Sequence, residues 1–138
     1  MRHAHAPTQH GLSLMELLIV LACIAVLTSW SLPTYQGWLL RSQRSQARIA
    51  LMQAAQWLER SAAANGHYPK WEDVPTNVWA IQGLNYQIQA RLSDQSFTLL
   101  AVPTGAQIED ACGNLTLTHL GEQGVQQARL PAASCWQR

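Results

Sequence analysis

Residues 11–27 read Gly11-Leu12-Ser13-Leu14-Met15-Glu16-Leu17-Leu18-Ile19-Val20-Leu21-Ala22-Cys23-Ile24-Ala25-Val26-Leu27, and the apolar run that they begin extends to Leu32. As a helix, the 21 residues from Leu12 to Leu32 would be about 31 Å long, close to the hydrocarbon thickness of a bilayer. Its one charged residue is Glu16, in the first turn. A carboxylate in lipid costs at least a few kcal/mol unless it is neutral or paired. Glu16 is therefore a candidate functional residue in a predicted transmembrane helix.

Two other kinds of membrane-directed segment are weaker interpretations of this run. A secretory signal peptide has a shorter apolar core, followed by a small-residue cleavage site. The sequence after Leu27 reads Thr-Ser-Trp-Ser-Leu-Pro and lacks a clear site of that kind. A plain signal anchor would fit the length of the run, but it gives no reason for the carboxylate of Glu16.

The start of the chain resembles the class III signal of type IV prepilins. The shared features are Gly11, the apolar Leu12, an acid five residues after the glycine and an unbroken apolar helix. The resemblance implies cleavage after Gly11 by a prepilin peptidase and methylation of the new amino terminus on Leu12. The sequence departs from the family by having Leu rather than Phe after the cut, and histidines such as His10 near the glycine in place of Lys or Arg.

The helix is predicted to continue beyond the apolar run. Pro33 removes one helical hydrogen bond and Gly37 weakens the same region, so we expect one long helix with a weak joint. The resemblance implies that Pro33 marks a segment that can unwind during filament assembly. Trp30, Tyr35 and Trp38 lie where an interfacial aromatic belt would fall.

Residues 37–64 have a helical period, with apolar side chains on one face. These are Leu40, Ala47, Leu51, Ala54 and Leu58. Another face carries Arg41, Arg44 and Arg48, which we interpret as solvated. The alternative is contact with lipid phosphates or with acidic groups of neighbouring subunits. Asn65-Gly66 is a helix-stop signal.

The rest of the chain predicts a small antiparallel sheet. Residues 65–83 contain Pro69 and Pro75, which forbid a continuous regular element there. Apolar and polar residues then alternate in three predicted strands. The strands cover 84–92, 97–102 and 115–120, with turns at 93–96 and 121–124 and room for a short fourth element before residue 131. Short connections imply a meander, and the apolar face of the preceding helix is available to cover it.

Cysteines and charge limit the possible functions. If the membrane segment places the rest of the chain outside the cytoplasm, Cys112 and Cys135 can form a disulfide, whereas Cys23 is expected to be free. Glu109-Asp110 is interpreted as part of a solvated loop. A formal net charge of +1 provides no strongly basic field, so charge does not support nucleic acid as a partner. We find no catalytic constellation, cofactor motif or metal site in the sequence.

The C-terminal part strengthens the resemblance. Asp110-Ala111-Cys112-Gly113, the alternating strand after it and the final Cys135-Trp136 resemble the disulfide region of PilE-type minor pilins. The resemblance implies the α+β type IV pilin fold, a long N-terminal helix packed on a small antiparallel β-meander. The expected organisation is a leader over 1–11, a transmembrane or filament-core helix half over 12–36 and a periplasmic pilin domain over 37–138. Within that domain we expect a helix over 37–64, an αβ-loop over 65–83, a sheet over 84–130 and a disulfide-closed region over 112–135.

The expected function is that of a structural minor pilin, not an enzyme. It would support pilus biogenesis, twitching motility, adhesion or DNA uptake. The subunit would be a single-pass inner-membrane protein with a periplasmic C-terminal domain, and later part of a filament at the cell surface. Expected partners are other pilin subunits, the prepilin peptidase, the inner-membrane assembly platform and, before assembly, membrane lipid. Two alternatives remain open, a type II secretion pseudopilin and a DNA-receptor minor pilin.

Overall fold

The computed structural model describes residues 13–80, 83 and 85–137 of the 138-residue chain. The chain divides into two compact units, with the boundary between Gly37 and Trp38. Helix α1, Leu14–Asn65, belongs to both. The prediction of one long helix is thus confirmed, and Pro33 lies inside it.

Helix α1 ends at the predicted stop signal. Gly66 follows the last helical residue with a φ of 80°, a left-handed conformation that favours glycine. Its N–H donates to the carbonyl oxygen of Ala62 at 2.8 Å, which satisfies one of the carbonyls at the end of the helix.

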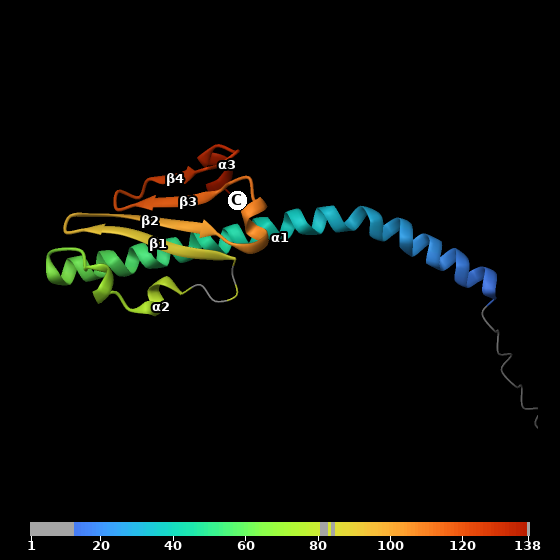
Figure 1. Cartoon of the computed structure of the whole chain (residues 1–138), viewed down its shortest axis with the longest axis horizontal. Coiled ribbons are helices and arrows are strands. Elements are labelled where there is room, and N and C mark those ends of the chain that lie inside the picture. Colours follow the sequence, from blue (N-terminus) through green and yellow to red (C-terminus); the bar gives the residue numbers. More distant parts are fainter. Residues whose placement is uncertain (1–12, 81–82, 84, 138) are drawn as a thin grey trace, which may run out of the picture. The chain divides into compact units, whose positions relative to one another are not determined.

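The second unit, which begins at Trp38, is called the globular unit. It contains a four-stranded antiparallel sheet in the order β1-β2-β3-β4 (Figure 1). The strands are β1 (Tyr86–Ser93), β2 (Ser96–Pro103), β3 (Asn114–Thr118) and β4 (Gln123–Gln126). Consecutive strands are neighbours, so the predicted meander is confirmed. Ala90 of β1 pairs with Leu99 of β2, which pairs with Leu117 of β3. This register places apolar side chains in a row on the core face of the sheet.

The C-terminal half of α1 covers that face, as the sequence predicted (Figure 1). Ala47, Leu51, Ala54 and Leu58 are at most 1% exposed and belong to the same core cluster as Phe97 and Leu115. Their spacing of three or four residues keeps them on one side of the helix. The helix and the sheet therefore form the two layers of a single hydrophobic core.

Several short elements differ from the sequence prediction. Residues 123 and 124 were predicted as a turn, but they begin strand β4, because Gln123 pairs with Leu117 and Gly124 with Thr116 of β3. The segment 65–83 contains two short helical turns, η1 (Trp71–Asp73) and α2 (Thr76–Trp79). The loop before Cys112 contains η2 (Gly105–Glu109), and the chain ends with α3 (Ala132–Trp136), which the sequence did not predict.

Within the residues that the structure describes, we find no helix whose length and apolarity would let it cross a membrane.

Candidate assembly surface and arginine groove

The residues predicted to act in processing and assembly belong to the first 33 positions of the chain. Gly11 and Leu12 are outside the described residues. Glu16 is in the first turn of α1 and is exposed. Pro33 lies within α1, and its side chain is outside the described part of the structure. Their roles in cleavage, methylation and assembly therefore stay predictions.

Large apolar side chains cover the first part of α1. Between Leu14 and Leu27 they are 48–76% exposed. The exposed set is Leu14, Met15, Leu17, Leu18, Ile19, Val20, Leu21, Ile24, Val26 and Leu27. The five consecutive members 17–21 turn through more than a full circle at about 100° per residue. The helix is therefore apolar on all sides, in contrast to the one-sided stripe of its C-terminal half.

The predicted disulfide joins Cys112 to Cys135, whose Cα atoms are 5.6 Å apart, and this prediction is confirmed. Both cysteines are fully buried. Cys23 is free and exposed, also as predicted. Next to the bridge, Gly113 has a φ of 53°, and a Cβ there would lie 2.5 Å from the carbonyl oxygen of Gln126. The backbone is therefore tightly packed where the bridge enters the sheet.

A buried ion pair holds α1 to the segment before the disulfide. The carboxylate of Asp110 accepts hydrogen bonds from Nε and Nη2 of Arg44 at 2.9 and 3.0 Å. The side chains are only 14% and 2% exposed. Asp110 also accepts from the backbone N–H of Cys112 at 3.1 Å. The sequence-based interpretation of both Arg44 and Asp110 as solvated is therefore wrong.

Gln107 extends this polar network toward the helix and the sheet. Its amide nitrogen lies 2.8 Å from Oδ2 of Asp110 and 3.1 Å from the carbonyl oxygen of Leu40. The same nitrogen lies 3.0 Å from the hydroxyl of Tyr86. Burial raises the pKa of Tyr86 to about 12, so the phenol stays neutral at physiological pH. The network thus connects α1, β1 and the disulfide segment.

Arg48 holds the other end of the disulfide. Its Nη1 donates to the backbone carbonyl oxygens of Trp136 and Gln137, directly after Cys135. Arg44 and Arg48 are one helical turn apart, so successive turns of α1 contact the two ends of the same bridge. We call these contacts, Arg44 to Asp110 and Arg48 to the two carbonyls, the arginine clamp. The Arg48 contact could not be predicted from the sequence, because its acceptors are backbone atoms 88 and 89 positions away.

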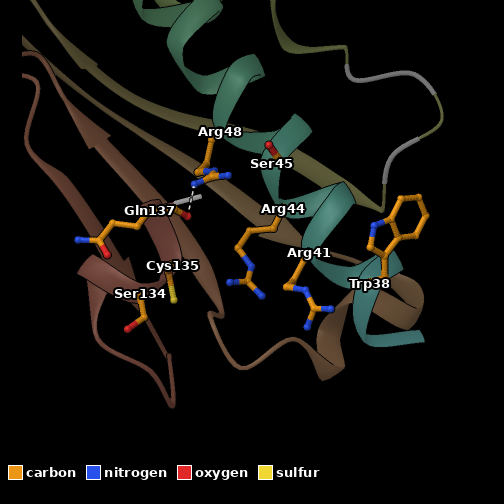
Figure 2. A pocket seen from close by; sticks show the side chains of 8 residues that line it. All are labelled: Trp38, Arg41, Arg44, Ser45, Arg48, Ser134, Cys135 and Gln137. Atoms are coloured by element: carbon orange, nitrogen blue, oxygen red, sulfur yellow. Dashed lines mark hydrogen bonds between the residues drawn. The ribbon is translucent and has the colours of Figure 1, made fainter. Parts of the chain in front are cut away.

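A groove of about 380 Å³ opens beside the clamp. It is lined by Trp38, Arg41, Arg44, Ser45, Arg48, Ser134, Cys135 and Gln137, and we call it the arginine groove. Figure 2 shows Arg41 and Arg44 projecting from α1 to the same side. Arg44 is neutralised by Asp110, whereas Arg41 is exposed and makes no hydrogen bond or ion pair to the part of the chain that the structure describes. No carboxylate is among these lining residues, and the exposed Arg41 is the cationic side chain that faces solvent there.

A second hollow, of about 530 Å³, lies beside the disulfide segment. Asn114, Gln127 and Arg129 contribute amide and guanidinium groups to its wall, and Glu109 and Asp110 contribute carboxylates. Arg129 donates through Nη2 to the carbonyl oxygen of Glu109 at 2.8 Å. We call this site the amide hollow. It presents several hydrogen-bonding side chains in the disulfide-closed region.

Comparison with protein-family models identifies the chain. Residues 33–116 match the family described as type IV minor pilin ComP, DNA uptake sequence receptor. The chain belongs to this family of type IV minor pilins. The N-terminal part of the pilin, residues 7–32, matches the prokaryotic N-terminal methylation motif. A search of curated proteins finds no match for this pilin.

Solved structures agree with this assignment. A type IV pilin from Shewanella oneidensis is 31% identical over 72% of this pilin and 99% of that chain, with a TM-score of 0.56. The non-core minor pilin PilV of Neisseria meningitidis has the same fold, with a TM-score of 0.55 and 21% identity over 68% of this pilin and 93% of that chain. The predicted type IV pilin fold and the predicted function as a minor pilin are confirmed.

Proposed function

We propose that this minor pilin is made as an inner-membrane precursor with its globular unit in the periplasm, and is then built into a pilus through the N-terminal half of α1. The prepilin peptidase would cut between Gly11 and Leu12, and Leu12 would then be methylated. The match of residues 7–32 to the methylation motif supports this processing. Other pilin subunits and the inner-membrane assembly platform would be its partners.

The observation that carries the proposal is the apolar surface of α1 between Leu14 and Leu27. Exposed apolar surface on every side of a helix needs a cover, because contact with water is unfavourable. Membrane lipid would supply that cover before assembly, and the helices of other subunits would supply it in the filament. Assembly would thus move one apolar helix from membrane lipid to the packed helices of the filament.

Glu16 would set the position of the pilin in the filament. Cleavage would create an amine on Leu12, and if the helix extended to that new amino terminus, the amine could not readily reach Glu16 of the same rigid turns. The amine could reach Glu16 of an adjacent subunit if the two helices were staggered by about one turn. Such a pair would offset the burial of both charges and would select one axial register.

We expect the Glu16→Ala pilin to be inserted and processed but poorly incorporated into filaments. Removing the carboxylate makes the helix more lipophilic, so insertion should survive while the register contact is lost. The measurement is the amount of pilin in the membrane fraction and in sheared pili, with the mass of the membrane-pool protein reporting cleavage after Gly11. Glu72→Ala, at an exposed position of the globular unit, is the control. Incorporation equal to wild type would contradict a role for Glu16 in register.

DNA binding is a second candidate function, favoured by the match to a family described as a DNA uptake sequence receptor. The amide hollow offers groups suited to DNA. Asn and Gln side chains can bond adenine edges, and Arg can bond guanine edges or phosphates. The near-neutral charge of the whole chain argues against a long basic tract, so any binding would depend on a few such contacts.

If the amide hollow binds DNA, we expect Arg129→Gln to weaken binding of labelled duplex DNA. The slope of log affinity against log salt should also become shallower by about one unit if Arg129 neutralises a phosphate. Fluorescence anisotropy of the full-length pilin over a salt series measures both quantities. The control is Arg91→Gln, which removes an exposed arginine on β1. Identical losses in the two variants would indicate general charge attraction and would reject the amide hollow as the site.

A further inference from the structure

The arginine groove lies at the N-terminal limit of the globular unit. Its first lining residue, Trp38, is also the first residue of that unit. Trp38 follows Leu32, the last residue of the apolar run, by six positions, which a chain can span over at most about 22 Å. If the apolar run lies in a bilayer, this short connection keeps Trp38 within reach of the lipid headgroups.

The charges in the groove suit a phosphate. The Arg44 charge is satisfied by the buried Asp110, so it contributes little to the groove. Arg41 has no such partner among the described residues, and its guanidinium projects beside that of Arg44 (Figure 2). Arg48 also lines the groove, but its guanidinium is engaged in the clamp by the carbonyl oxygens of Trp136 and Gln137. Guanidinium groups bind phosphate oxygens through paired hydrogen bonds.

The neutral residues of the groove suit the rest of a lipid headgroup. Trp38 is 57% exposed, and the indole combines an apolar ring with one N–H donor. Side chains of this kind are enriched at membrane interfaces. Ser45 and Ser134 place hydroxyl groups in the same lining. The groove therefore combines the exposed guanidinium of Arg41, hydroxyls and an amphipathic ring in one volume of about 380 Å³.

We infer that the arginine groove binds the phosphate of an anionic membrane phospholipid while the pilin waits in the membrane, with Arg41 as the main contact. This inference rests on the proposed membrane anchoring. A soluble phosphate has the same chemistry, but it would not be held beside the groove by the apolar helix. An arginine near an anionic lipid surface strengthens association about five-fold.

The test compares full-length wild-type pilin with Arg41→Gln, Arg41→Lys and Arg60→Gln. Arg60 is an exposed arginine on α1 that does not line the groove. Each protein is purified in detergent and titrated with phosphatidylglycerol, phosphatidylcholine, inorganic phosphate or a short DNA duplex, and the bound fraction is measured by native mass spectrometry. We expect Arg41→Gln to weaken phosphatidylglycerol binding about five-fold, with wild-type affinity in Arg60→Gln and most of it in Arg41→Lys. Unfolding temperatures should match in all four proteins, because Arg41 and Arg60 are exposed and neither makes a hydrogen bond or ion pair to the described part of the chain.

Three results would overturn the inference. Equal affinity in wild type and Arg41→Gln would remove Arg41 from the contact. Binding of inorganic phosphate with the same affinity as phosphatidylglycerol would identify a site for free phosphate. Loss of binding to a short DNA duplex in Arg41→Gln, with unchanged lipid binding, would assign the groove to nucleic acid. Membrane fractionation of wild-type cells separates these results from failure of the proposed function, since a pilin absent from membranes would contradict the anchoring itself.

Discussion

Replacing Asp110 by alanine is expected to lower the free energy of unfolding of the globular unit by about 3–5 kcal/mol. The carboxylate is 2% exposed and receives hydrogen bonds from Arg44, Gln107 and the N–H of Cys112. Its removal leaves the guanidinium of Arg44 partly buried without a counter-charge, and that uncompensated charge is the main cost. The packing of strand β1 should also be weakened, because Gln107 contacts both Asp110 and Tyr86 of that strand.

Urea unfolding of the full-length pilin in detergent, followed by tryptophan fluorescence, measures this effect. The matched control is Glu109→Ala, which removes an exposed carboxylate from the adjacent position and should change stability by no more than about 0.5 kcal/mol. A double variant, Arg44→Met with Asp110→Leu, should recover much of the lost stability, because it removes both charges together. Similar stabilities of Asp110→Ala and Glu109→Ala would show that the ion pair does not stabilise the fold.

Loss of the disulfide is the second change with a large expected effect. Replacing Cys112 and Cys135 together by serine should cost about 2–5 kcal/mol, because the bridge closes a loop between residues 23 positions apart. Serine hydroxyls at two fully buried positions would add to the cost. The unfolding temperature of the double variant should therefore fall well below that of wild type.

Thermal unfolding of the oxidised full-length pilin tests this expectation. Cys23→Ser is the control, since Cys23 is free and exposed and its replacement should leave the unfolding of the globular unit unchanged. Alkylation of the unfolded, unreduced protein should label Cys23 alone. Labelling of either distal cysteine, or equal unfolding temperatures for the double variant and wild type, would contradict a stabilising bridge.

The main elements of this fold could be predicted from the sequence because each has a repeating apolar pattern. The helical spacing from Ala47 to Leu58 and the alternation in β1 predicted both layers of the core. Strand β4 lacked such a pattern, since Val125 is the one apolar residue among its four. It depends on partners distant in sequence, including the indole of Trp136, whose Nε1 donates to the carbonyl oxygen of Gly124 at 2.8 Å.

The functional residues also differ in whether they could be predicted from the sequence. The residues expected to act in processing and assembly belong to a local motif, so Gly11 and Glu16 could be proposed without a structure. The clamp could not, because Arg44 finds its carboxylate 66 positions later in the chain. A helical wheel places Arg41, Arg44 and Arg48 on one polar face. Only the structure shows that Arg44 and Arg48 contact the disulfide region, whereas Arg41 is exposed in the groove.

The arginine clamp has a mechanical consequence for a subunit built into a fibre. Tension that enters along α1 reaches the C-terminal region through two contacts in parallel, one on each side of a covalent bridge. Arg44 pulls on the segment of Cys112, Arg48 pulls on the segment of Cys135, and the disulfide prevents the two segments from separating. The two arginine contacts and the disulfide would thus share the tension with the hydrogen bonds between the strands.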